Sequence, residues 1–347
     1  MGSLDSSSKL PWFKTPCVYS PQLSQAAGCN IYLKLENLQP SGSFKSRGIG
    51  NLMNRAAAAA VGPVHFYCSS GGNAGLACAT TALALGHPAT IVVPILTPPL
   101  MKGKLADLGV EVIQVGNNWA VADQYLRDEL LAKDPTGVYV PPFDHPHVWE
   151  GAATMIPELK EQMEHDIDAI VCSVGGGGLL NGIMQGIESI AWLGTKPQAL
   201  ALETTGADSL NASIRAESHV TLPGITSIAI SLGAPRVSEQ TWKWSQSENL
   251  QSLVVSDADA AMSCVRFAND ARHLVEAACG ATLAAAYRGI LRERLGQRLS
   301  DQEWSLKHVV LVVCGGSNIT LEMLQEYKDK YSDESCIKAQ GVDKSTV

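Results

Sequence analysis

Short runs of apolar, mostly β-branched residues alternate along this chain with longer amphipathic stretches. Each run has the length and composition of a buried strand, and each intervening stretch can form a helix that joins parallel strands. The alternation predicts an α/β fold in which helices cover both faces of parallel sheets. The predicted strands are 31–36, 65–70, 89–94, 110–116, 138–143, 168–175, 198–206, 250–257 and 308–316.

The strands fall into two groups, which predict two domains with a cleft between them. The first group ends near residue 143, and the alternation restarts with a predicted helix over 149–165. A chain of 347 residues is too long for one typical core, which agrees with two domains. Further helices are expected over 119–133 and, as a pair, over 257–292.

The composition argues against several classes of protein. Apolar residues make up 46% and charged residues 17% of the chain, which is typical of a globular protein with a sizeable core. The net charge of −8, without a basic cluster, argues against nucleic acid or an anionic membrane as a partner. No apolar run approaches the ~20 residues that span a bilayer, and the chain begins without an apolar signal segment.

The nine cysteines indicate reduced thiols in a cytoplasmic protein. An odd number without a Cys-x-x-Cys pair fits neither a disulfide framework nor a zinc site. Several of them, such as Cys172, lie in apolar runs and are expected to be buried. Cys314 ends the run VVLVVC at the edge where open α/β sheets bind ligands, although a buried core thiol is the simpler interpretation of spacing alone.

One loop carries a lysine in an unusual setting. In PSGSFKSRG (40–48), Lys45 lies among small residues at the start of a predicted helix. The positive end of the helix dipole favours a neutral amine there, and a neutral amine is the nucleophile that forms a Schiff base. Taken alone, a solvated surface lysine remains the commoner interpretation.

Two further loops, each between a predicted strand and a helix, are suited to anions. In CSSGGNAG (68–75), free backbone N–H groups and the hydroxyls of Ser69 and Ser70 suit a carboxylate, while a plain turn with a local Asn73 hydrogen bond fits equally well. In SVGGGGLLNGI (173–183), consecutive glycines let backbone amides approach a phosphate. This is not a nucleotide P-loop. Glu203 lies at about the spacing that a dinucleotide site requires, so spacing leaves that alternative open.

Taken together, the motifs resemble one family. Seven motifs follow the order found in fold-type II pyridoxal-phosphate enzymes. They are PSGSFKSRGIG, SSGGNAG, PPFDHPHVWEG, SVGGGGLLNGI, LETTGADS, ITSIA and VCGGSNI. Within that group the chain resembles the eukaryotic L-serine dehydratases, also called L-serine ammonia-lyases or L-threonine dehydratases. The resemblance implies a two-domain α/β fold like that of the tryptophan synthase β subunit, with parallel-rich twisted sheets. It places the large cofactor-binding domain at 1–41 plus 149–347 and the small domain at 42–148.

The resemblance also implies roles for individual residues. Lys45 would hold pyridoxal 5'-phosphate covalently and act as the catalytic base. The rest of the cofactor site would be formed by Phe44, Asn73, Gly175, Gly176, Gly177, Gly178, Leu179 and Cys314. The substrate would be bound by Ser69, which would also be catalytic, and by Ser70, Gly71, Asn73 and Ser231. A monovalent cation, K+, would lie among Gly175, Glu203, Ala207, Leu232 and Ala234.

The implied reaction removes water and ammonia from L-serine to give pyruvate, and from L-threonine to give 2-oxobutyrate. The resemblance further implies a cytoplasmic homodimer in the amino-acid metabolism that supplies gluconeogenesis. Related outcomes stay open: a threonine dehydratase, a serine racemase, or a biosynthetic enzyme that eliminates or replaces a group on a modified amino acid. A binding protein that keeps only the fold is a further alternative, and a nicotinamide oxidoreductase fits by analogy of fold alone.

Five positions depart from the family pattern. Ala152 stands where close relatives carry His, and Ile230 and Ser231 replace a Lys–Ala pair. Ala277 replaces a Pro, and Gly71 replaces an Ala found in some members. We expect Ala152 and Ser231 to lie near the substrate and the small Gly71 to leave more room there. These differences bear on the preferred amino acid more than on the reaction type.

Overall fold

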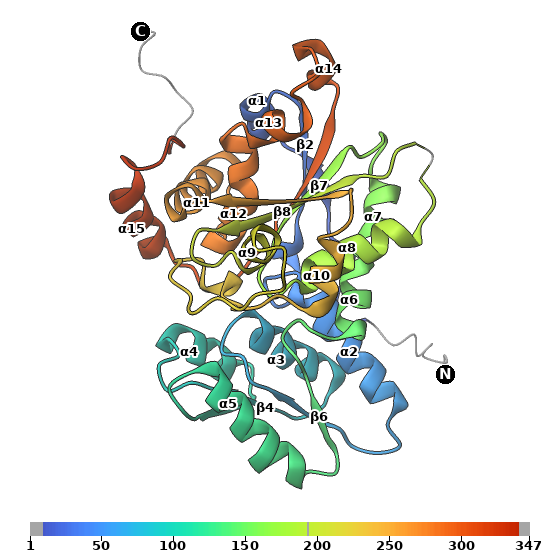
Figure 1. Ribbon diagram of the computed structural model, residues 1–347. Coiled ribbons are helices and arrows are strands. Elements are labelled where there is room, and N and C mark those ends of the chain that lie inside the picture. Colours follow the sequence, from blue (N-terminus) through green and yellow to red (C-terminus); the bar gives the residue numbers. More distant parts are fainter. Residues whose placement is uncertain (1–9, 193, 340–347) are drawn as a thin grey trace, which may run out of the picture.

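The computed structural model describes residues 10–192 and 194–339. It contains a six-stranded sheet in the order β1-β2-β10-β7-β8-β9 and a four-stranded sheet in the order β5-β4-β3-β6. Paired strands are parallel, except that β1 pairs antiparallel with β2. The expected α/β architecture with parallel-rich sheets is therefore confirmed (Figure 1).

The six-stranded sheet has helices on both sides (Figure 1). Its central strands are mainly apolar because both faces are covered, and every residue of β7 is buried. The strands are β1 (Cys17–Tyr19), β2 (Asn30–Lys34), β7 (Ala169–Ser173), β8 (Gln198–Thr204), β9 (Leu250–Val255) and β10 (His308–Val312). The main covering helices are α7 (Met155–Gln162), α8 (Gly178–Ser189), α11 (Asp257–Ala271) and α12 (Ala277–Tyr287).

The four-stranded sheet is formed by one continuous stretch of chain. Its strands are β3 (His65–Cys68), β4 (Ala89–Val93), β5 (Glu111–Gln114) and β6 (Gly137–Tyr139). Its helices are α2 (Lys45–Ala59), α3 (Asn73–Leu85), α4 (Pro99–Asp107) and α5 (Trp119–Tyr125), and the chain returns to the larger sheet through α6 (Pro146–Ala153). The carboxyl ends of its strands face the loops that follow, which is where ligands bind in such sheets.

Two predicted helices differ in detail from those observed. The helix expected over 149–165 is divided into α6 and α7 because Pro157 has no N–H and its ring crowds the carbonyl one turn earlier. The helix expected over 119–133 is α5 followed by a π-helical turn at Leu126–Leu130 and a 3-10 turn at Leu131–Lys133. The predicted pair over 257–292 is α11 and α12.

The remaining elements connect these layers. They are α1 (Pro21–Ala27), η1 (Glu36–Leu38), α9 (Ser209–Arg215), η4 (Ile230–Leu232), α10 (Glu239–Trp244), α13 (Ile290–Leu295), α14 (Asp301–Ser305) and α15 (Leu321–Tyr331). Within the described residues, no helix combines the length and apolar character that crossing a bilayer requires. All nine cysteines are free and seven of them are buried, as expected from their apolar neighbours.

A buried ionic cluster fastens the start of α2 to the six-stranded sheet and to α7. The guanidinium of Arg47, wholly buried, donates to both carboxylate oxygens of Glu36, at 2.7 and 2.8 Å, and to both of Glu158, at 2.6 Å each. Lys34, on β2, also donates to Glu158 at 2.6 Å. The paired carboxylates offset the cost of burying the cations, so α2 is anchored two residues after Lys45.

Candidate active site

Lys45 is the first residue of α2 and faces the loop that follows β6. Its Nζ donates a hydrogen bond to the carbonyl oxygen of Pro142 at 2.5 Å and lies 5.3 Å from the centre of the Phe44 ring. Burial lowers its pKa from 10.5 to about 8. The amine is therefore available in its neutral, nucleophilic form much closer to neutral pH than an ordinary lysine.

The Lys45 loop is joined by backbone hydrogen bonds to the loop after β10. Phe44 N–H donates to the Cys314 carbonyl at 3.1 Å, and Gly316 N–H donates to the Gly42 carbonyl at 3.0 Å. Gly315 has a φ of +88°, and a Cβ there would lie 2.3 Å from the Gly42 oxygen, so only glycine fits this approach. The structure thus brings Lys45 and Cys314 together, as expected.

The glycine loop between β7 and α8 presents unpaired backbone donors. Residues 176–179 are buried, and no residue in the described ranges accepts a hydrogen bond from the backbone N–H groups of 175–179. Buried N–H groups without an acceptor are costly, and the dipole of α8 adds positive potential at the same place. The loop is therefore built to receive an anion such as a phosphate.

The same glycines are also required by packing inside the protein. A Cβ at Gly176 would lie 2.3 Å from the Phe143 ring, and one at Gly177 would lie 1.7 Å from Thr241 Oγ1. Gly177 in addition has a φ of +95°. Close packing and free amides are compatible in this loop, because the missing side chains let Phe143 and Thr241 approach while the backbone N–H groups stay unpaired.

The serine loop after β3 differs in part from the expectation. Ser69 is wholly buried, and its hydroxyl donates to Asp123 at 2.5 Å, so this proton is not free for a substrate carboxylate. Ser70 is partly exposed, and its hydroxyl accepts from the N–H of Gly72 at 3.3 Å. A methyl group added at Gly71 would meet Thr97 Cγ2 at 2.7 Å, so Thr97 fills the space that the glycine leaves.

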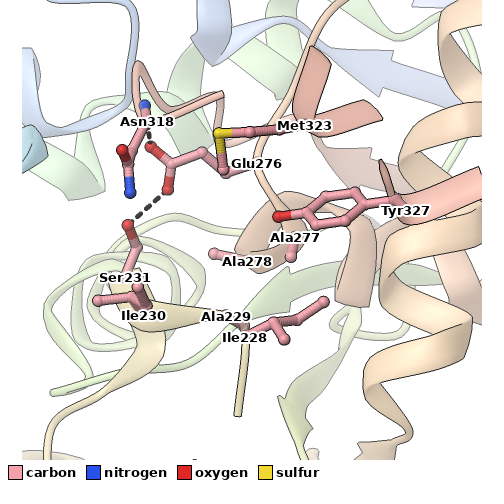
Figure 2. Close-up of a pocket in the computed structure, with 10 residues that line it drawn as sticks. All are labelled: Ile228, Ala229, Ile230, Ser231, Glu276, Ala277, Ala278, Asn318, Met323 and Tyr327. Atoms are coloured by element: carbon pink, nitrogen blue, oxygen red, sulfur yellow. Dashed lines mark hydrogen bonds between the residues drawn. The ribbon is translucent and has the colours of Figure 1, made fainter. Parts of the chain in front are cut away.

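Asn73, the first residue of α3, lies in a polar cluster that joins both parts of the chain. Its Nδ2 donates to Glu276 at 2.9 Å and to Ser231 at 3.3 Å, and its Oδ1 accepts from the N–H of Ser317 at 3.0 Å. Asn318 N–H donates at 2.8 Å to the same Glu276 oxygen as Asn73, and Ser231 Oγ donates to the other oxygen at 2.5 Å. Figure 2 shows Glu276 between Ser231 and Asn318, at the wall of a cavity of about 30 Å³.

Glu276 is a residue of this site that sequence reasoning missed. It is 5% exposed and immediately precedes the long apolar helix α12. A single acidic residue before a helix of alanines could have marked it, because a buried carboxylate needs donors from elsewhere. Those donors come from Asn73, Ser231 and Asn318, which are far from it in the sequence.

Comparison with known proteins agrees with this geometry. The sequence pattern described as "Pyridoxal-phosphate dependent enzyme" matches residues 9–315. The chain belongs to this family. It is 44% identical to the human protein named L-serine dehydratase/L-threonine deaminase, over 91% of this chain and 94% of that one. Among solved structures it resembles a fungal L-serine ammonia-lyase from Rhizomucor miehei, with a TM-score of 0.85, 37% identity and coverage of 93% and 100%. It also resembles a processed threonine deaminase isoform 2 from Solanum lycopersicum, with a TM-score of 0.80, 25% identity and coverage of 92% and 83%.

The residues of this chain fit the cofactor that the family name implies. Pyridoxal phosphate needs a lysine amine for its aldehyde and an anion site for its phosphate. The amine of Lys45 and the unpaired amides of the glycine loop supply these two groups. Both lie beside the loop after β6, because Lys45 Nζ donates to the Pro142 carbonyl and a Cβ at Gly176 would meet the Phe143 ring. Ser173, which ends β7 before the glycine loop, has its Oγ 3.5 Å from Cys314 Sγ, so the loop, the thiol and the lysine lie in one region.

The residues expected to hold a cation are only partly free to do so. Both carboxylate oxygens of Glu203 accept backbone N–H groups, from Leu210 and Asn211 at 2.8 Å each, at the start of α9. Burial raises the pKa of Glu203 to about 8. Gly175 and Leu232 do lie side by side, since a Cβ on the glycine would be 3.1 Å from the leucine Cα. In the described part of the chain, no three His, Cys, Asp or Glu side chains form a metal cluster.

Two of the departures from the family pattern have different surroundings. Ala152 is buried in the contact between α6 and α8, where a Cβ at Gly182 would lie 2.4 Å from the Ala152 Cβ. Helix packing explains a small residue there, without reference to substrate. Ser231 instead lies in the Glu276 cluster beside Asn73, and Ile230 next to it is 68% exposed.

Proposed function

We propose that this chain removes water and then ammonia from L-serine to give pyruvate, and acts in the same way on L-threonine to give 2-oxobutyrate. The observation that carries the proposal is the amine of Lys45, whose pKa burial lowers to about 8, in one region with a loop of unpaired backbone amides. The names of the 44% identical human relative and of the similar fungal structure support the same reaction.

In this proposal the chain positions the amino acid and moves one proton. Bound pyridoxal phosphate supplies the electron sink that makes the Cα–H bond of an amino acid acidic. Lys45 Nζ takes that proton, and its neutral form is favoured by burial. The Cα electrons form the Cα–Cβ double bond as the C–O bond breaks, and the β-hydroxyl leaves as water with the proton that Lys45 Nζ took from Cα. Released 2-aminoacrylate then hydrolyses to pyruvate and ammonia.

The finer assignments belong to the same proposal. The unpaired amides of residues 175–179 hold the phosphate, Phe44 and Cys314 line the ring, and Asn73 contacts it from the small domain. The substrate carboxylate lies against the serine loop, with Ser70 and the loop amides as donors. We further propose a small domain over 42–148, a large domain from 1–41 plus 149–347, and a homodimer. We also propose that the protein is cytoplasmic, because the nine free cysteines of the chain suit a reducing compartment.

A product assay tests the proposal. The purified protein, saturated with pyridoxal phosphate, is incubated with L-serine and L-threonine, and pyruvate, 2-oxobutyrate and D-serine are measured separately. We expect the two oxo acids, and in Lys45→Ala a loss of at least about 100-fold. Borohydride reduction should attach the cofactor at Lys45. D-serine as the main product, or attachment at another lysine, would overturn the assignment.

A further inference from the structure

A buried carboxylate lies beneath two loops of the candidate site. Asp123, on α5, accepts hydrogen bonds from Ser69 Oγ at 2.5 Å, from the Tyr139 hydroxyl at 2.7 Å and from Arg127 Nε at 2.8 Å. Ser69 directly follows β3 and Tyr139 ends β6, and these two strands are parallel neighbours. One carboxylate therefore joins the carboxyl ends of two adjacent strands.

The hydrogen bonds to Asp123 are strong ones. Burial alone would raise the pKa of Asp123, but the hydrogen bonds from Ser69, Tyr139 and Arg127 outweigh it and hold this pKa below its ordinary value. Hydrogen bonds to an ionised acceptor are about twice as strong as neutral ones. Any movement of Ser69 or Tyr139 would leave a buried charge with fewer donors, so both residues are held firmly.

Ser69 and Tyr139 each lie close in the sequence to a group of the candidate site. Ser69 is followed by Ser70, the partly exposed residue of the serine loop. Tyr139 lies three residues before Pro142, whose carbonyl accepts the hydrogen bond from Lys45 Nζ. The side chains of Ser69 and Tyr139 both donate to Asp123. Asp123 therefore influences the two loops through these hydrogen bonds and not through a contact of its own with the site.

We propose that Asp123 is a positioning residue, which holds the serine loop in the form that receives the substrate carboxylate and sets the Pro142 carbonyl against Lys45. This inference rests on the proposed function, because the carboxylate is that of the amino-acid substrate. The proton of the Ser69 hydroxyl is committed to Asp123. The carboxylate is then received by Ser70 and the loop amides, and Ser69 acts through the backbone that it fixes.

Substitution of Asp123 and of its donor tests the proposal by kinetics. In the holoenzyme, Asp123→Asn should raise the KM for L-serine about 10-fold, with a smaller change in kcat, since one buried donor then lacks its acceptor. Ser69→Ala should also raise KM. The double variant should be no worse than Asp123→Asn, because both changes break the same interaction.

Asp134 offers a matched control. It also accepts three hydrogen bonds, from the Tyr67 hydroxyl at 2.8 Å, from Thr136 N–H at 2.8 Å and from Thr136 Oγ1 at 2.7 Å. It precedes β6, at the opposite end of the strand from Tyr139. Asp134→Asn should therefore leave KM within about twofold of wild type, even if it lowers the melting temperature.

Hydrogen exchange without substrate provides a readout that does not depend on turnover. The segment 66–76 should exchange faster in Asp123→Asn and Ser69→Ala than in wild type or Asp134→Asn. Wild-type KM and exchange in Asp123→Asn would overturn the inference, as would an equal rise in KM in Asp134→Asn. If wild type turned over neither serine nor threonine, the proposed function would fail, and the exchange result alone would decide whether Asp123 positions the loop.

Discussion

Replacing Arg47 with alanine should lower the free energy of unfolding by about 3–5 kcal/mol, because it leaves a buried carboxylate without its cation. Glu36 is wholly buried, and among the described residues the only charged group that donates hydrogen bonds to it is Arg47, at 2.7 and 2.8 Å. Its other partners, Thr15 and Gln39, are neutral. Glu158 is affected less, since Lys34 still donates to it at 2.6 Å.

That loss is a large share of the stability of a typical protein, which is about 5–15 kcal/mol. Arg55 provides the matched control, because it lies on the same helix and pairs with Glu150 on α6, but its side chain is 48% exposed. Exposed pairs contribute about 0–1 kcal/mol, so Arg55→Ala should be nearly neutral. Adding Glu36→Gln to Arg47→Ala should recover part of the loss, because the carboxylate that lost its cation is then neutral.

Urea unfolding at saturating pyridoxal phosphate, followed by circular dichroism, measures these differences with the cofactor contribution held constant. The reasoning would be refuted if Arg47→Ala lost less than about 1 kcal/mol, or if Arg55→Ala lost as much. It would also be refuted if the double variant were less stable than Arg47→Ala alone, since the cost would then lie in packing and not in charge.

Three other predictions concern the site. Uptake of pyridoxal phosphate by cofactor-free protein should speed up as pH rises through about 8, the lowered pKa of Lys45, and a midpoint near 10.5 would contradict this. Gly177→Ala should weaken cofactor binding at least about 10-fold, whereas Gly289→Ala, at a φ of +74° with open space around it, should not; equilibrium dialysis distinguishes them. Because the family resemblance implies a K+ site that includes Glu203, KCl should raise the melting temperature of wild type more than an equal concentration of a bulky organic cation does, and this difference should vanish in Glu203→Gln.

Elements that depend on local pattern could be predicted from the sequence. Nine apolar runs were assigned as strands, and β2 to β10 lie within a few residues of them. The strand β1 was missed because it has only three residues, exposed or partly exposed, and forms through its pairing with β2. The break between α6 and α7 carried a local signal in Pro157 that the apolar periodicity concealed.

The site could be predicted where backbone and motif define it, and not where distant side chains meet. Lys45, the glycine loop and Cys314 were expected from their motifs, and the structure brings them into one region. The hydrogen bond from Ser69 to Asp123 spans 54 residues, and that from Asn73 to Glu276 spans 203. Such pairs depend on how strands are ordered in the sheets, which no local pattern specifies.

The place of β10 within its sheet has a consequence for folding during synthesis on the ribosome. This strand, from the last tenth or so of the ordered fold, lies between β2 and β7 and pairs with both. Until β10 emerges from the ribosome, no other described strand joins β2 to β7. The unpaired edges of these two strands stay open to wrong partners or chaperones. A chain truncated before residue 308 should thus leave the larger sheet as two unjoined parts, β1-β2 and β7-β8-β9, and should fail to retain vitamin B6.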